Sequence, residues 1–167
     1  LKNKKLKYLM NNKYYLRFLN ESEYNLWDDF VENCENGSVF NKSYWLQPLF
    51  NFKSASLKIL GYYDKSKKLV AGFAFGQKIK FKLIPIIFPP VLTPISNLVI
   101  TPLAKSLESK KESYNSKIIT SFINFLEKKY KLLSFTFDQD FKDIRSFIWK
   151  GYKENIRYTY RSNITDL

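Results

Sequence analysis

The chain has 167 residues, of which 45% are hydrophobic and 18% aromatic. It is therefore long and apolar enough for one domain with a buried core, and too apolar for intrinsic disorder. It has one cysteine and no histidine, which excludes an internal disulfide, a Ser-His-Asp triad, a Cys-His dyad and a His-ligated zinc site within this chain. A single cysteine favours a reducing compartment, so we expect a cytoplasmic protein.

The formal net charge of +13 is the usual sign of a polyanionic partner. However, 24 of the 28 cationic residues are lysines, and the chain is rich in Asn, Ile, Phe and Tyr, which have AT-rich codons. Codon bias alone gives such a composition, so a solvated basic surface is one interpretation and a functional basic surface the other. No transmembrane segment is expected, because the most apolar stretch, residues 83–100, contains four prolines that would break a spanning helix.

The first third of the chain predicts a strand followed by helices. Residues 14–19 are typical of a short strand. Asn20 with Glu23 three residues later resembles a capping box, and a helix is expected to continue to residue 32. Beyond the turn at residues 36–37, the pattern predicts a brief strand at residues 39–40 and a short helix over residues 43–50.

The middle of the chain predicts a meander of strands. A hairpin is expected over residues 56–75, with a polar turn at residues 64–67. Residues 78–83 alternate lysine with an apolar residue, which predicts a strand with one wet and one buried face. The proline-rich passage that follows, up to Pro102, is expected to be largely irregular and either to line a cleft or to pack as a plain segment.

The last third predicts two helices, each followed by a strand. A long helix is expected over residues 113–131 and an interior strand over residues 132–137. A second helix, capped by Asp140, is expected to end at Gly151. A final strand is expected over residues 156–165. The element order is that of a mixed α/β domain.

Two arginines in the final segment are the most distinctive local feature. In a strand, Arg157 and Arg161 would project from one face together with Thr159, with neighbouring residues of that face about 7 Å apart. Arginine in a lysine-rich chain indicates bidentate binding of a phosphate or carboxylate. The alternative is a solvated strand face that pairs with acidic neighbours.

A second candidate site lies at the predicted helix over residues 43–50. Lys42 and Trp45 could contact an anionic ligand at the helix N-terminus, where backbone amides favour negative charge. The alternative is that Trp45 belongs to the core and Lys42 to the solvated surface. Asp138 and Asp140 are the acidic pair placed most like catalytic groups, but helix capping explains Asp140, so no catalytic residue is assigned.

In four segments the chain resembles the N-terminal half of FemABX-like proteins, a GNAT-related group that includes the peptidoglycan bridge aminoacyltransferases. The resemblance is carried by residues 27–31, by residues 36–40 with 43–46, by residues 89–94, and by residues 147–152 leading into 157–160. It implies a GNAT-like acyl-CoA N-acyltransferase fold, with a central, mostly antiparallel mixed sheet flanked by helices. It also implies a domain plan with a basic extension at residues 1–15, a GNAT-like domain at residues 16–155, and a strand at residues 156–167 that leads into a second GNAT-like domain.

The resemblance implies an acceptor-side domain of an acyl or aminoacyl transferase. The donor co-substrate would be aminoacyl-tRNA or acyl-CoA, the acceptor an amine of a cell-wall (muropeptide) or other small anionic molecule, and no bound cofactor or metal is expected. The expected substrate-binding residues are Lys42, Trp45, Arg157, Tyr158, Tyr160 and Arg161. This part alone is not expected to be active. The alternatives are a basic, non-catalytic RNA-binding module and a structural domain that binds a partner.

Overall fold

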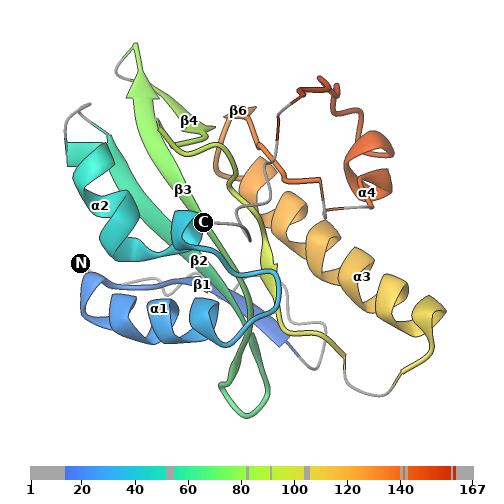
Figure 1. Ribbon diagram of the computed structural model, residues 1–167. Coiled ribbons are helices and arrows are strands. Elements are labelled where there is room, and N and C mark those ends of the chain that lie inside the picture. Colours follow the sequence, from blue (N-terminus) through green and yellow to red (C-terminus); the bar gives the residue numbers. More distant parts are fainter. Residues whose placement is uncertain are drawn as a thin grey trace, which may run out of the picture.

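The β2–β3 hairpin is the centre of the fold (Figure 1). The computed structural model describes residues 14–51, 55–81, 83–90, 92–103, 106–139, 141, 143–158 and 160. Strands β2 (Ser56–Asp64) and β3 (Leu69–Lys80) pair antiparallel, as the alternation of residues 56–75 predicts. The carboxylate of Asp64 closes the turn, because it accepts hydrogen bonds from the Ser66 hydroxyl and the Lys68 amide.

The other strands extend this hairpin on both sides. β1 (Tyr14–Phe18) pairs antiparallel with β2, and β4 (Ile84–Phe88) pairs antiparallel with β3. β6 (Leu132–Leu133) pairs parallel with β4, and β5 (Val99–Ile100) pairs with the first half of β3. The sheet order is β1-β2-β3-β4-β6, with β5 beside β3. The expected mixed α/β fold, with a mostly antiparallel mixed sheet flanked by helices, is confirmed.

Helices α1 (Tyr24–Glu32) and α2 (Ser43–Asn51) cover one face of the sheet (Figure 1). Short 3-10 turns, η1 (Glu21–Glu23) and η2 (Val39–Asn41), precede them. Two glycines of β3 make room for the largest side chains of these helices. A β-carbon at Gly72 would lie 2.2 Å from the ring of Trp27, and one at Gly76 would lie 2.3 Å from the ring of Phe50.

Helices α3 (Glu108–Glu127) and α4 (Arg145–Ile148) lie on the opposite face (Figure 1). The buried face of α3 packs on apolar side chains of β2, β3 and β4, and alternate residues of β3 point to the two faces. The α3 residues in this core are Ile118, Ile119, Phe122, Ile123, Phe125 and Leu126. The sheet therefore lies between two helical layers.

Several expected elements differ from those in the structure. Residues 39–40 belong to η2 rather than to a strand, because Ser38 and Asn41 form a capping box around it. β3 ends at Lys80, so residues 78–83 are not one strand. The expected strand over residues 132–137 is reduced to β6, and the expected helix over residues 140–150 is reduced to α4. Position 140 lies outside the described residues.

The two ends of the domain plan are described only in part. Of the basic extension at residues 1–15, only the last two residues are described, and they already belong to β1. Of the final segment, residues 156–158 and 160 are described and have no regular structure. A strand needs a neighbouring edge, and no backbone hydrogen bond among the described residues joins this segment to one. The strand predicted there is not formed in its described part.

Candidate functional site

The charges at the start of α2 are paired within the chain. Nζ of Lys42 forms an ion pair with Glu32, and this hydrogen bond raises the pKa of Lys42. The amide of Ser43 donates to Oδ1 of Asp28 at 2.6 Å, and its hydroxyl donates to Oδ2 of Asp28 at 2.7 Å. The carboxylate of Asp28 therefore occupies the N-terminus of α2, where the sequence predicted that an anionic ligand could bind.

Trp45 connects α2 to the proline-rich segment. Its indole Nε1 donates to the hydroxyl of Thr93 at 3.2 Å, and its ring meets that of Phe40 edge-on, with 5.6 Å between centroids. Thr93 is buried and Trp45 is half-buried. Trp45 thus combines a packing role with a partly exposed face beside the proline-rich segment, and the structure brings Lys42 and Trp45 to the same end of α2.

Three asparagines hold the second half of the proline-rich segment in place. Nδ2 of Asn41 donates to the carbonyl of Asn97 at 3.1 Å, and Nδ2 of Asn36 donates to the carbonyl of Leu98 at 2.8 Å. The side chain of Asn97 accepts from the amide of Asp138 at 3.0 Å and donates to the Asp138 carboxylate. The second half of this segment is therefore held in place by side-chain hydrogen bonds.

Sequence reasoning missed this polar layer, because Asn97 lies 56 residues beyond Asn41 in the chain. The one signal of this layer in the sequence was Asn97, whose side-chain amide stands directly before the apolar run at residues 98–100. A buried amide needs hydrogen-bond partners, so its position already indicated polar groups opposite it.

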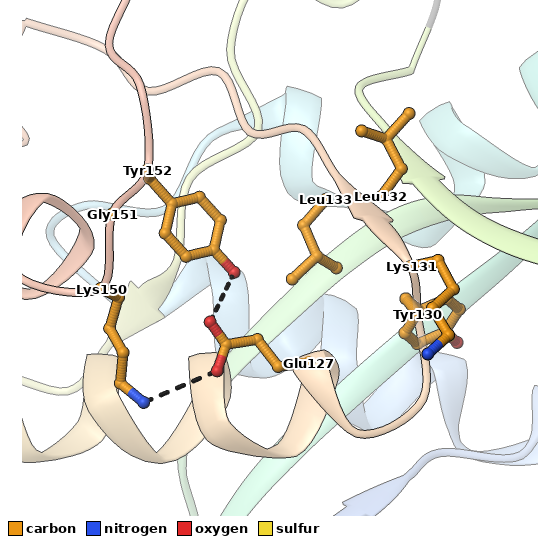
Figure 2. Close-up of a pocket in the computed structure, with 8 residues that line it drawn as sticks. All are labelled: Glu127, Tyr130, Lys131, Leu132, Leu133, Lys150, Gly151 and Tyr152. Carbon is orange, nitrogen blue, oxygen red and sulfur yellow. Dashed lines mark hydrogen bonds and ion pairs between the residues drawn. The ribbon is translucent and has the colours of Figure 1, made fainter.

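A groove of about 390 Å³ lies between the end of α3, β6 and the chain that follows α4. Figure 2 shows Tyr152 and Lys150 pointing from one side toward Glu127 on α3, with Leu133 beside them. The Tyr152 hydroxyl donates to Oε1 of Glu127 at 3.3 Å, and Nζ of Lys150 lies 3.6 Å from Oε2. The residues that line the groove are Glu127, Tyr130, Lys131, Leu132, Leu133, Lys150, Gly151 and Tyr152.

The phenols of this groove stay protonated across the physiological range. Burial raises the pKa of Tyr130 to about 12, and its hydroxyl donates to Oε1 of Gln77 at 2.7 Å. Burial and the neighbouring Glu127 also raise the pKa of Tyr152. The groove thus offers a carboxylate, an ammonium group and a neutral phenol above the apolar side chain of Leu133. In the helical pattern of the sequence, Glu127 falls on the side of the helix away from its apolar face, so this site was not predicted.

The remaining predicted site residues come after Tyr152 in the sequence. Tyr158 and Tyr160 are fully exposed, and Arg157 is exposed as well. Arg161 lies outside the described residues. Within the described ranges, no hydrogen bond, ion pair or ring contact joins Arg157, Tyr158 or Tyr160 to Lys42 or Trp45. The structure therefore brings the first pair of predicted residues together but does not connect it to the second group.

Among the residues that the structure describes, no group of His, Cys, Asp and Glu side chains could hold a metal ion. No helix in the described ranges has the length and apolar character needed to cross a bilayer. Cys34 is buried, which raises its pKa, and its Sγ lies 4.0 Å from the hydroxyl of Thr101.

No family model and no curated protein matches the sequence. Solved structures that resemble the chain include an aminoglycoside antibiotic 6'-N-acetyltransferase from Acinetobacter baumannii, with 13% identity, a TM-score of 0.48, and coverage of 90% of this chain and 97% of the other. Ribosomal-protein-alanine N-acetyltransferase from Brucella melitensis biovar Abortus 2308 has 9% identity, a TM-score of 0.49, and coverage of 90% and 98%. An acetyltransferase from Trypanosoma brucei has 12% identity, a TM-score of 0.49, and coverage of 90% and 99%.

Proposed function

We propose that the chain is the acceptor-side domain of an N-acyltransferase, which acylates an amine of a small, partly anionic acceptor. The observation that carries the proposal is the short parallel pair of β4 and β6 near the end of α3, together with the groove beside it. Parallel pairing there covers only Ile86 with Leu132 and Ile87 with Leu133. The chain then leaves β4, and the carbonyl of Thr136 accepts from the amide of Ser96 instead. The groove with Glu127 lies beside this short parallel pair.

The groups of the groove suit an amine acceptor. An amine arrives mainly as an ammonium ion, which the Glu127 carboxylate attracts and from which it can take a proton. The neutral Tyr152 hydroxyl holds that carboxylate in place. In the proposed reaction the amine nitrogen bonds to the acyl carbon of the donor, and the C–O or C–S bond of the ester or thioester breaks. The leaving group departs with the electron pair and takes up a proton, while the amine gives up its own.

The predicted binding residues are assigned to the anionic part of the acceptor. Arg157 follows Tyr152, a residue of the groove, by five residues in the sequence. We assign its guanidinium group to the anionic part, with Tyr158 and Tyr160 as stacking surfaces; Arg161 is given the same role from the sequence alone. Trp45 and Lys42 lie on the other face of the sheet and do not line the groove; we assign them to a separate contact with the acceptor beside the proline-rich segment, to which Lys42, paired with Glu32, contributes less charge.

The resemblance to FemABX-like proteins supports the remaining assignments. The donor is acyl-CoA or aminoacyl-tRNA, its site lies in a second GNAT-like domain, the acceptor is muropeptide-like, and the protein acts in the cytoplasm. Catalysis comes mainly from holding amine and acyl carbon together, which can supply several kcal/mol of the barrier.

The test is acyl transfer by the full-length polypeptide. Acetyl-CoA and charged tRNA serve as alternative donors, and amino sugars, amino acids and muropeptides as acceptors; release of free CoA and formation of the amide are measured. We expect transfer from one donor, with Glu127→Gln lowering kcat/KM by at least about tenfold. Glu35→Gln, which changes another carboxylate, is the matched control. If no donor supports transfer, or if both variants behave alike, the proposal is wrong.

A further inference from the structure

The end of the β3–β4 hairpin carries apolar side chains that no other part of the described chain covers. Ile79 is 56% exposed, Phe81 83%, Leu83 84% and Ile84 39%. We call these four residues, together with Lys78 and Lys80, the hairpin tip. In Figure 1 the tip extends well beyond the helices that flank the sheet. The alternation of residues 78–83 therefore does not mark a buried face, and the apolar residues at the tip need another explanation.

The turn of the hairpin contains a bulky residue where small ones are preferred. The amide of Leu83 donates to the carbonyl of Lys80 at 3.2 Å, and Phe81 has a φ of 50°. Asn and Gly are favoured in this left-handed region, and a bulky aromatic residue there is rare. An exposed phenylalanine in an unfavourable backbone conformation gives the folded chain no benefit by itself. Such residues cluster at binding sites, where a partner compensates for the cost.

The lysines of the tip lack the acidic neighbours that other lysines of this chain have. Between Lys65 and Leu107 the sequence contains no Asp or Glu. Lys42, Lys111 and Lys150 form ion pairs, whereas no ion pair in the described ranges includes Lys78 or Lys80. The tip is thus both apolar and positively charged, which is complementary to an anionic surface with an apolar interior.

The geometry of the tip favours a fluid interface over a protein surface. Lys80 pairs with Ile84, and Ile79 pairs with Pro85. Since neighbours along a strand point to opposite faces, Ile79 and Ile84 leave the hairpin on opposite sides. A single flat protein surface could cover only one of them, whereas lipid headgroups and acyl chains surround an inserted tip on all sides. A second copy of this chain would bring like charges together.

We propose that the hairpin tip inserts into the surface of a membrane that contains anionic lipids. Phe81, Leu83 and Ile79 enter the boundary between headgroups and acyl chains, and Lys78 and Lys80 contact the anionic headgroups. This binding is peripheral and reversible, and it does not depend on the acyl transfer proposed above.

The test is flotation of the full-length protein with two kinds of vesicle. One contains phosphatidylcholine alone, and the other also contains about 30% phosphatidylglycerol, which supplies an anionic surface. We expect binding to the anionic vesicles that weakens with added salt. Phe81→Asn keeps the turn, because Asn tolerates the left-handed conformation, and should weaken binding about tenfold, as should Leu83→Ser. The double variant K78Q/K80Q should weaken binding to anionic vesicles by a similar factor.

Matched controls remove equivalent groups elsewhere. Leu26→Ser removes an exposed leucine from α1, and K110Q/K117Q removes two exposed lysines from α3; both should bind vesicles as the wild type does. The proposal is overturned if the wild type does not float with anionic vesicles, or if the controls lose binding as much as the tip variants. It is also overturned if Phe81→Asn changes only self-association in sedimentation, because the tip would then be a protein interface.

Discussion

The ring of Trp27 lies directly against the backbone of Gly72: a β-carbon at position 72 would come within 2.2 Å of Cζ3 and 2.9 Å of Cη2. Trp27 is fully buried, and its indole Nε1 donates to the carbonyl of Asn41 at 2.7 Å, so the ring cannot move away without losing that bond. The contact joins α1, η2 and β3.

This contact predicts a large effect of Gly72→Ala. The added methyl group should destabilise the fold by about 1–3 kcal/mol through overpacking, measured as a lower free energy of unfolding in urea. In a Trp27→Leu background, where the ring is absent, the same substitution should cost much less, and the double-mutant cycle should show the coupling. Equal costs in both backgrounds would mean that the ring does not restrict position 72.

The Arg17–Glu23 pair predicts a dependence of stability on pH. Its two hydrogen bonds, at 2.7 and 2.8 Å, together with the Asn20 amide, lower the pKa of Glu23 from 4.5 to about 2. Because the folded pKa lies below the unfolded one, the pair stabilises the fold above about pH 4.5, and this contribution is lost as the pH falls toward 2. Arg17 is partly exposed, so solvent screens the pair. We therefore expect the pair to contribute about 1 kcal/mol to the free energy of unfolding.

The measurement for this pair is urea unfolding between pH 7 and pH 2.5. Glu23→Gln should be less stable than the wild type at pH 7 and nearly equal to it at pH 2.5. Glu21→Gln changes an exposed carboxylate two residues away. Its free energy of unfolding should change between pH 7 and pH 2.5 by the same amount as that of the wild type. A constant gap between Glu23→Gln and the wild type would argue against this linkage.

The buried side chain of Asn97 predicts a second stability effect. Asn97 is 2% exposed and exchanges two hydrogen bonds with Asp138. Asn97→Ala should lower the free energy of unfolding by about 1–3 kcal/mol, because it removes both bonds from a buried position. Asn25→Ala, at an exposed position of α1, should be neutral or slightly stabilising. A neutral Asn97→Ala would mean that the polar layer does not hold the segment.

The proposed acceptor site predicts a selective kinetic effect. Replacing Arg157 and Arg161 together with alanine should raise the acceptor KM about tenfold while kcat stays near the wild-type value, because a lost binding contact that is equal in ground and transition states changes KM alone. The pair K65A/K153A removes the same charge from exposed positions and should leave both parameters unchanged. An unchanged KM in the arginine variant would remove these residues from the site.

The sequence predicted the elements that have a clear local signal. The hairpin over residues 56–75 has alternating apolar residues and a polar turn, and the helix before residue 32 has the capping box of Asn20 and Glu23, which the structure contains. The long helix α3 was predicted from its apolar face, although it begins at Glu108 rather than at residue 113.

Elements that depend on distant contacts were not predictable in this way. The alternation of residues 78–83 is compatible with a buried strand face, and only the structure shows that no described part of the chain covers Ile79, Phe81 and Leu83. Residues 132–137 are nearly all apolar or β-favouring, which suits an interior strand. Beyond Ser134, however, the carbonyl of Thr136 bonds to Ser96 in an irregular segment. The groove likewise requires Glu127 and Tyr152 to meet, although 25 residues separate them.

Strand β3 has partners along both edges: β2 lies on one side, and β5 and β4 follow each other on the other. On the second edge β5 covers Ala71 and Gly72, and β4 covers Gly76 to Lys80. We expect the amides of β3 that are bonded to these strands and to β2 to be among the last to take up deuterium. The far end of β3 carries the hairpin tip. We therefore expect a rigid, slowly exchanging strand to hold Phe81 and Leu83 away from the body of the protein.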